Sequence, residues 1–190
     1  MEKYLKRIAD SLERAFPLKP DTSFFEKSAA FIWDPDQNHY TEVTNVQTVD
    51  IALLKGMDQE IEQVRLNTKA FIDGNLANNV LVWGARGMGK STLIKSVVMA
   101  ACSMSNCLKI IEVARDDIAQ VGKLLKTIKN LNKKFIIFCD DISFDDNETG
   151  YKSLKSLLDG GLIGGPQNIL IYATSNRRHL LSRKTGDNSD

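Results

Sequence analysis

A short stretch near the middle of the chain, WGARGMGKST at residues 83–92, carries the residue types needed to hold a phosphate group. Gly84, Gly89, Lys90 and Ser91 satisfy the pattern G-x-x-x-x-G-K-[ST] in full. Glycines allow a tight backbone turn whose N–H groups face phosphate oxygens, and a helix that starts there adds its positive dipole end. Lys90 would reach the β- and γ-phosphates, and the Ser91 hydroxyl would bind Mg²⁺. The pattern therefore predicts a phosphate-binding loop.

We call residues 84–92 the glycine loop and expect nucleotide contacts along all of it. Its members are Gly84, Ala85, Arg86, Gly87, Met88, Gly89, Lys90, Ser91 and Thr92. The N-K-x-D motif that reads guanine does not occur in the sequence, which favours ATP over GTP as the nucleotide.

A second group of candidate residues follows the apolar run FIIFC at residues 135–139. Asp140 is the candidate ligand of Mg²⁺, and Asp141 stands where a carboxylate could orient an attacking water. Adjacent carboxylates at a strand end repel each other, so a cation between them would relieve that cost. The alternative is that the two aspartates only cap the next turn.

Polar residues also end a third apolar run, in the segment YATSN at residues 172–176. A side chain at such a strand tip can reach the γ-phosphate or the attacking water. Asn176 is the first candidate for this role, with Thr174 and Ser175 behind it. The alternative is a polar strand end that starts a turn.

Short apolar runs that alternate with helical patterns surround these residues and predict the elements that position them. Continuous apolar strands of this kind are typical of a parallel sheet covered on both faces, so we expect an α/β fold. The expected strands cover residues 79–83, 108–113, 134–141 and 168–176. The expected helices cover residues 91–104, 116–131 and 151–158.

The first part of the chain has the apolar spacing of helices. We expect one helix over residues 4–16 and a second that begins after Asp21 or Thr22 and continues through Phe31 to Asp34-Pro35. Residues 34–50 are polar and read as a linker with at most one short strand. A further helix is expected over residues 58–72.

Composition narrows the class of protein. The 190 residues are 43% hydrophobic and 26% charged, with a net charge of +1, so composition gives no argument for nucleic acid or an anionic membrane. No segment approaches the ~20 apolar residues that span a bilayer, and the N-terminus has no signal-peptide pattern. The three cysteines have no metal-like spacing, which favours free thiols and a cytoplasmic location.

The sequence resembles AAA+ ATPases in the segments GARGMGKST, FCDDISF, YKSLKSLLDGGL and LIYATSNRRHLL. Within that class it is similar to an uncharacterised bacterial family of predicted ATP-binding proteins, a domain of unknown function, over roughly residues 50–181. The resemblance implies a P-loop NTPase three-layer sandwich that binds ATP and Mg²⁺. The motif residues it implies are Gly84, Gly89, Lys90 and Ser91 as Walker A, Asp140 and Asp141 as Walker B, and Asn176 as sensor 1. The segment around Gly56, Met57 and Asp58 resembles the entry to the adenine pocket.

The sequence also departs from the AAA+ pattern. We expect no fifth strand, arginine finger or C-terminal lid in this chain, although Arg177 and Arg178 directly after Asn176 could approach a phosphate or a neighbouring subunit. The expected organisation is a helical N-terminal region and linker (1–50), an AAA+-like core (51–181) and a polar, disordered tail (182–190).

Two functions follow as expectations. The first is an ATPase that couples ATP binding and hydrolysis to a macromolecular partner, with Ser91 and Asp140 as Mg²⁺ ligands and Asp141 and Asn176 as catalytic residues. The alternative is a nucleotide-binding scaffold or regulator with little hydrolysis, since the lid and arginine finger are missing. A small-molecule kinase would need a substrate-binding insertion that the sequence does not show. We expect a homo-oligomer or a protein partner, without a nucleic acid or a membrane.

Overall fold

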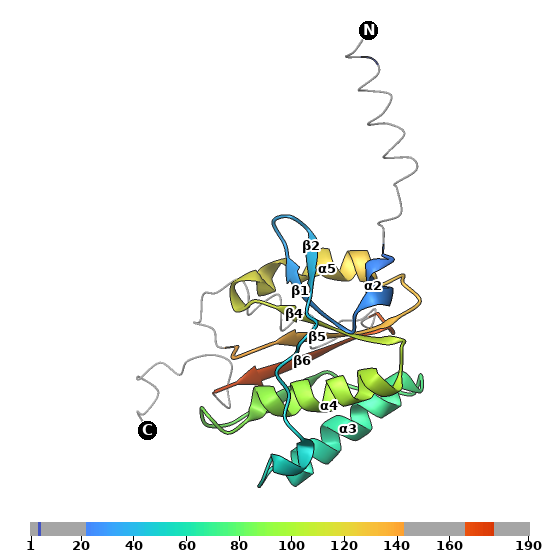
Figure 1. The fold of residues 1–190 in the computed structure, drawn as a ribbon. Coiled ribbons are helices and arrows are strands. Elements are labelled where there is room, and N and C mark those ends of the chain that lie inside the picture. The colour runs from blue at the N-terminus through green and yellow to red at the C-terminus, as the bar shows by residue number, and fades with distance from the viewer. Residues whose placement is uncertain (1–3, 5–21, 143–165, 177–190) are drawn as a thin grey trace, which may run out of the picture.

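A six-stranded sheet between two layers of helices forms the body of the protein (Figure 1). The computed structural model describes residue 4, residues 22–142 and residues 166–176. The strand order is β2-β1-β4-β5-β6-β3. The strands are β1 (Ala30–Asp34), β2 (His39–Glu42), β3 (Val80–Trp83), β4 (Leu108–Val113), β5 (Lys134–Cys139) and β6 (Ile169–Ser175). All neighbouring pairs are parallel except β1 and β2.

Helices cover both faces of this sheet. In Figure 1, α3 and α4 lie against one face, and α2 and α5 lie on the other. The helices are α2 (Phe24–Lys27), η1 (Ile51–Leu53), α3 (Asp58–Ile72), α4 (Lys90–Met104), η2 (Arg115–Gln120) and α5 (Val121–Ile128). The two layers explain why the central strands are apolar on both sides.

Alternate residues of each central strand pack into different cores. In β5, Phe135 and Ile137 pack with the α5 layer, whereas Ile136 and Phe138 pack with α3 and α4. All four side chains are fully buried. This period of two follows from the strand geometry, because successive side chains point to opposite faces of a sheet.

The predicted fold class is confirmed, because the chain forms an α/β sandwich around a mostly parallel sheet in which a glycine loop joins β3 to α4. The four predicted strands are present as β3, β4, β5 and β6, with ends that differ by at most two residues and agree fully for β4. Parallel strands bring their carboxyl ends to the same edge of a sheet, so the loops after β3, β5 and β6 lie together. Ligands of open α/β sheets bind outside this edge.

The predicted continuation of the second helix through Phe31 is wrong. Only the four residues of α2 are helical, and the next apolar residues form β1, which pairs with β4 and with β2. Phe31 and Trp33 pack on the α5 face, and Ala30 packs on the opposite face. The Asp34 carboxylate accepts N–H groups of the turn that follows, which returns the chain into β2. The sheet therefore also uses residues that precede residue 51.

Several expectations fall outside the described residues. These are the helix over residues 4–16 apart from Tyr4, the helix over residues 151–158, the arginines at 177 and 178, and the tail over residues 182–190. In the part of the chain that the structure describes, no helix combines the length and apolar character needed to cross a bilayer.

Candidate functional site

The glycine loop is anchored at both ends by regular structure. At its start, the Gly84 N–H donates to the Ser175 carbonyl of β6 at 3.2 Å. Toward its other end, Gly89 is the N-terminal cap of α4, and residues 90–92 of the loop form the start of that helix. Gly87 and Gly89 have φ angles of 81° and 84°, in the left-handed region that glycine adopts without a steric penalty. The loop thus places the N-terminus of a 15-residue helix at the carboxyl edge of the sheet.

The segment after η1 lies against the far end of the loop. A Cβ atom placed on Gly89 would lie 3.5 Å from Leu54 Cδ2 and 3.8 Å from Met57 Sδ. Gly56, between them, has a φ of 75°. Apolar side chains therefore border the turn at Gly89, where the sequence predicted contact with adenine. Leu54 was not among the predicted site residues, because nothing in its local sequence indicates this contact.

Lys90 is held inside the loop. It is only 6% exposed, and its Nζ donates to the carbonyls of Gly84 at 3.0 Å and Ala85 at 2.8 Å. A third hydrogen bond, of 2.9 Å, reaches Asn176 Oδ1 beyond β6. A buried ammonium group needs such partners, since an unpaired buried charge is costly. A bound phosphate could replace these neutral acceptors with a charged one.

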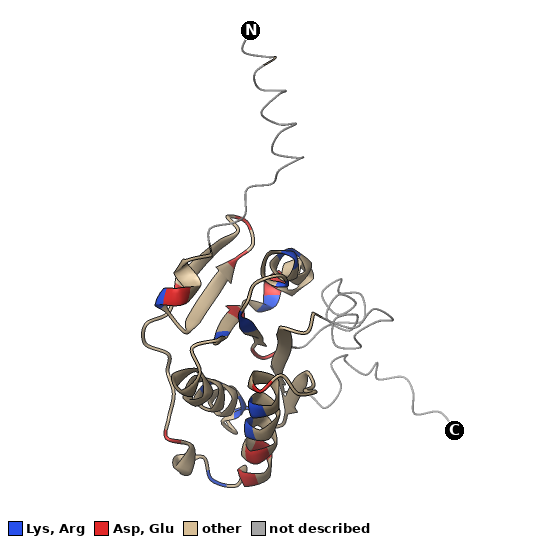
Figure 2. Ribbon diagram, turned by 90° about the vertical axis from the view of Figure 1, so that its right-hand side faces the viewer, with Lys and Arg blue, Asp and Glu red and all other residues tan. Residues whose placement is uncertain are grey.

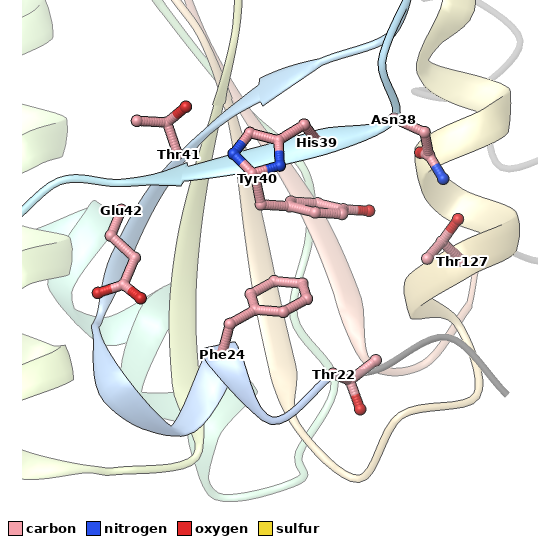
Figure 3. A pocket seen from close by; sticks show the side chains of 8 residues that line it. All are labelled: Thr22, Phe24, Asn38, His39, Tyr40, Thr41, Glu42 and Thr127. Atoms are coloured by element: carbon pink, nitrogen blue, oxygen red, sulfur yellow. The ribbon is translucent and has the colours of Figure 1, made fainter.

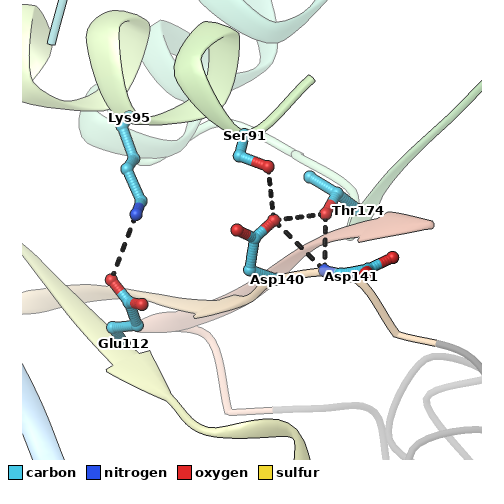
Figure 4. A network of polar contacts seen from close by, with 6 residues as sticks. All are labelled: Ser91, Lys95, Glu112, Asp140, Asp141 and Thr174. Carbon is cyan, nitrogen blue, oxygen red and sulfur yellow. Dashed lines mark hydrogen bonds and ion pairs between the residues drawn. The ribbon is translucent and has the colours of Figure 1, made fainter. Parts of the chain in front are cut away.

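Asp140 receives several hydrogen bonds on one oxygen atom (Figure 4). The hydroxyls of Ser91 and Thr174 each donate to Asp140 Oδ1 at 2.5 Å, and the Asp141 N–H donates to it at 3.1 Å. The second oxygen of the carboxylate points to the other side in Figure 4. The structure therefore brings the two predicted metal ligands, Ser91 and Asp140, into direct contact.

Asp141 has an unusual backbone conformation for a residue with a side chain. Its φ is 48°, a region that aspartate tolerates better than most residues. Its N–H donates to Thr174 Oγ1 at 2.8 Å, and its carboxylate accepts a hydrogen bond from the side-chain amide of Asn176. The two predicted catalytic residues are therefore joined to each other, and Asn176 also joins them to Lys90.

The donor set suits a small hard cation. Ser91 and Asp140 offer a hydroxyl and a carboxylate oxygen, and Mg²⁺ prefers oxygen ligands, of which substrate phosphates and waters supply the others. Among the described residues, no group of three or more histidine, cysteine, aspartate or glutamate side chains gathers to hold a metal on its own. The residues present therefore fit a cation that arrives together with phosphate.

These side chains line one cavity of about 330 Å³. Its lining comprises Arg86, Gly87, Gly89, Lys90, Ser91, Thr92, Asp140, Asp141, Thr174 and Asn176. Of the other predicted loop residues, Gly84 and Ala85 accept hydrogen bonds from Lys90, and Met88 is an exposed residue at the loop tip. Thr174 enters the site through its contacts with both aspartates, whereas the sequence suggested it only as a substitute for Asn176.

A second cavity, of about 430 Å³, lies beside β2 and α5 (Figure 3). The Phe24 ring stacks on Tyr40 with centroids 5.1 Å apart, and the Tyr40 hydroxyl points toward Thr127. Burial raises the pKa of Tyr40 to about 12. Among the described residues that line this cavity there is neither lysine nor arginine, so this lining does not resemble a phosphate site.

Comparison with known proteins decides the family. A family model described as "Protein of unknown function (DUF815)" matches residues 26–190. The chain belongs to this family. The expected relation to an uncharacterised family is thereby confirmed. No match was found among curated proteins.

Solved structures similar to this DUF815 chain include a DnaA protein and a RuvB protein. AMPPCP-bound DnaA from Aquifex aeolicus is 19% identical, with a TM-score of 0.43 over 65% of this chain and 39% of that one. The RuvB Holliday junction branch migration motor from Thermotoga maritima is 18% identical, with a TM-score of 0.45 over 66% of this chain and 40% of that one. The chain thus spans about two fifths of each of these proteins.

Proposed function

We propose that this chain binds ATP together with Mg²⁺ and hydrolyses it to ADP and phosphate, as the AAA+ resemblance implies. The observation that carries the proposal is the single cavity at the carboxyl edge of the sheet, where Lys90, Ser91, Asp140, Asp141 and Asn176 lie together. Parts of the chain far apart in sequence supply a phosphate-binding loop, a metal-binding pair and a polar group suited to the γ-phosphate. We infer that these are Walker A, Walker B and sensor 1.

The roles of the residues follow from their contacts. Lys90 would transfer its hydrogen bonds from the loop carbonyls to phosphate oxygens, and the loop N–H groups would add to this binding. Ser91 and Asp140 would hold Mg²⁺, which neutralises charge that develops on the phosphates. Asp141 would orient the attacking water and accept its proton. Asn176 would donate a hydrogen bond to the γ-phosphate.

One observation favours the second function, a nucleotide-binding module with little turnover. The Asp141 carboxylate accepts a hydrogen bond from Asn176 on Oδ1, and this partner would compete with a water molecule for that oxygen. In that case the chain would act as a scaffold or regulator through nucleotide binding alone, without hydrolysis. A measured rate of phosphate release separates the two functions.

A second copy of this chain, or another protein, is the partner that we propose. Large exposed apolar side chains in η1, at the end of β3 and in the glycine loop support a protein contact, since Leu53, Trp83 and Met88 are 70%, 53% and 55% exposed. In Figure 2, basic and acidic residues are interspersed along the helices. This mixed charge argues against a nucleic-acid partner. The three free cysteines support a cytoplasmic location.

Equilibrium binding of a fluorescent ATP analogue to the purified chain tests the proposal, together with phosphate release across a range of protein concentrations. Lys90→Ala should weaken binding by roughly 10- to 100-fold, because each hydrogen bond to a charged group contributes about 1.5–3 kcal/mol. Lys69→Ala, which removes an exposed lysine of α3, is the control and should bind like the natural chain. Equal affinity of both variants would refute the phosphate-binding role. Binding without release at any concentration would favour the second function.

A further inference from the structure

Thr174 lies between the two aspartates and bonds to both. It is a residue of β6 with 1% exposure, and its hydroxyl donates to Asp140 Oδ1 at 2.5 Å. The same hydroxyl oxygen accepts the Asp141 N–H at 2.8 Å. Its main-chain carbonyl accepts the Ile142 N–H at 2.8 Å. One residue thus holds three consecutive residues after β5.

The position of Thr174 is fixed from several sides. Its strand pairs with β3 at Val82 and with β5 through the preceding residue, Ala173, opposite Cys139. A β-branched side chain also has few accessible rotamers. The hydroxyl is therefore a rigid donor, and Figure 4 shows that it approaches Asp140 Oδ1 from a different direction than Ser91 does.

We infer that Thr174 is a positioning residue, which sets the orientation of the Asp140 carboxylate toward Ser91 and keeps Asp141 in its left-handed backbone conformation. This inference rests on the proposed binding of ATP and Mg²⁺ at the same site. Loss of the hydroxyl removes one of two side-chain donors from Asp140 Oδ1 and the shorter of the two hydrogen bonds of the Asp141 N–H. Residues that orient a metal ligand in this way typically change metal affinity by about 10- to 100-fold when they are mutated.

The choice of hydrogen-bond partner by the Thr174 hydroxyl is not explained by a purely structural role. A buried threonine can satisfy its hydroxyl without a charged partner, as Thr68 does with the Val64 carbonyl of its own helix and the Tyr172 hydroxyl. The Thr174 hydroxyl instead donates its one hydrogen bond to the carboxylate of Asp140, which faces the glycine loop. Its oxygen then fixes the neighbouring residue that we propose to orient water.

The test measures the affinity of a fluorescent ATP analogue for the full chain in EDTA and along a Mg²⁺ titration. Thr174→Val keeps the shape and removes the hydroxyl, Thr174→Ser keeps the hydroxyl, and Thr68→Val is a control at an equally buried threonine. Thr174→Ala serves as a second variant without a hydroxyl if valine prevents folding. Thermal unfolding of each variant verifies that it is folded.

The expected result is the same affinity in EDTA for all variants, within about 2-fold. In the titration, Thr174→Val should need about 10- to 100-fold more Mg²⁺, while Thr174→Ser and Thr68→Val follow the natural chain. An unchanged Mg²⁺ requirement in Thr174→Val would overturn the positioning role and leave the proposed function intact. An equal loss in Thr174→Ser would also overturn it, because the methyl group would then be responsible. Absence of nucleotide binding by the natural chain would overturn the proposed function itself.

Discussion

Asn176 donates its side-chain N–H to the carboxylate of Asp141, a residue 35 positions earlier in the chain. The oxygen of the same amide accepts from Lys90 Nζ at 2.9 Å. The amide thus has a donor on one side and an acceptor on the other, which determines its orientation. A phosphate that accepts the hydrogen bonds of Lys90 would break the hydrogen bond between Lys90 and Asn176. Phosphate binding at the proposed site would thereby be linked to the residue proposed to orient water.

Replacement of Asn176 tests this link. Asn176→Ala should keep nucleotide affinity within about 3-fold, because the loop and Lys90 remain, but should lower phosphate release by about 10²- to 10³-fold, as loss of a donor to a developing negative charge does. Single-turnover phosphate release at saturating ATP and Mg²⁺ measures this effect. Turnover equal to that of the natural chain would show that Asn176 does not contact the reacting phosphate.

Asp141→Asn separates binding from hydrolysis. Asparagine tolerates the φ of 48° and can still bond to Asn176, so the fold and the affinity for ATP should be unchanged. Without a carboxylate to accept a proton, phosphate release should fall by about 10²- to 10⁴-fold. Asp73→Asn, at an exposed ion pair at the end of α3, is the control and should retain full turnover. Similar rates in the two variants would exclude Asp141 as the base.

Substitution of two glycines with the same backbone conformation can distinguish an effect on stability from an effect on phosphate binding. Gly87 in the glycine loop and Gly74 after α3 have φ angles of 81° and 80°, and a Cβ atom at either would meet no atom within 4 Å. Alanine at each should therefore cost about 1–2 kcal/mol of unfolding free energy, through the left-handed backbone alone. Urea unfolding should show similar losses for both variants. Only Gly87→Ala should lose affinity for ATP, and an equal affinity in both would argue against phosphate contacts by the loop turn.

The buried thiols should make the free energy of unfolding decrease as the pH rises into the alkaline range. Burial raises the pKa of Cys139 and of Cys102 from 9.0 to about 12. The unfolded chain ionises these thiols at the lower pKa, so their contribution to stability is complete below pH 9 and is lost as the pH rises toward 12. Each thiol can contribute a slope of up to about 1.4 kcal/mol per pH unit. Urea unfolding between pH 8 and 11 should show a shallower loss for Cys139→Ala than for the natural chain, and parallel curves would contradict the shift.

The arrangement of the site could be predicted from sequence because its signals are local. A glycine pattern between a strand and a helix, and polar residues at the ends of two apolar runs, need only the rule that parallel strands end at one edge. That rule places Ser91, Asp140 and Asn176 together, as the structure does. The contact of Thr174 with Asp140 was not predictable in this way, because it depends on the register between β5 and β6.

The hairpin of β1 and β2 shows a second limit. The residues from Phe24 to Trp33 are rich in aromatic side chains whose spacing fits a helix as well as a strand. Their conformation is decided by β4, since Ala30 pairs with Ile110 far along the chain. Tertiary pairing of this kind overrides local propensity.

The pairing of β3 has a consequence for the time at which the residues of the candidate site come together. Among the described strands β3 pairs with β6, and the Asn79 side chain just before it accepts the N–H of Ile171, 92 positions later. At about 5–20 residues per second, a ribosome needs roughly 5–20 s to make that stretch. Throughout this interval the nascent glycine loop has neither Asn176 for its lysine nor a neighbouring strand for β3. ATP binding as proposed would therefore use a site that is complete only after residue 176 has been translated.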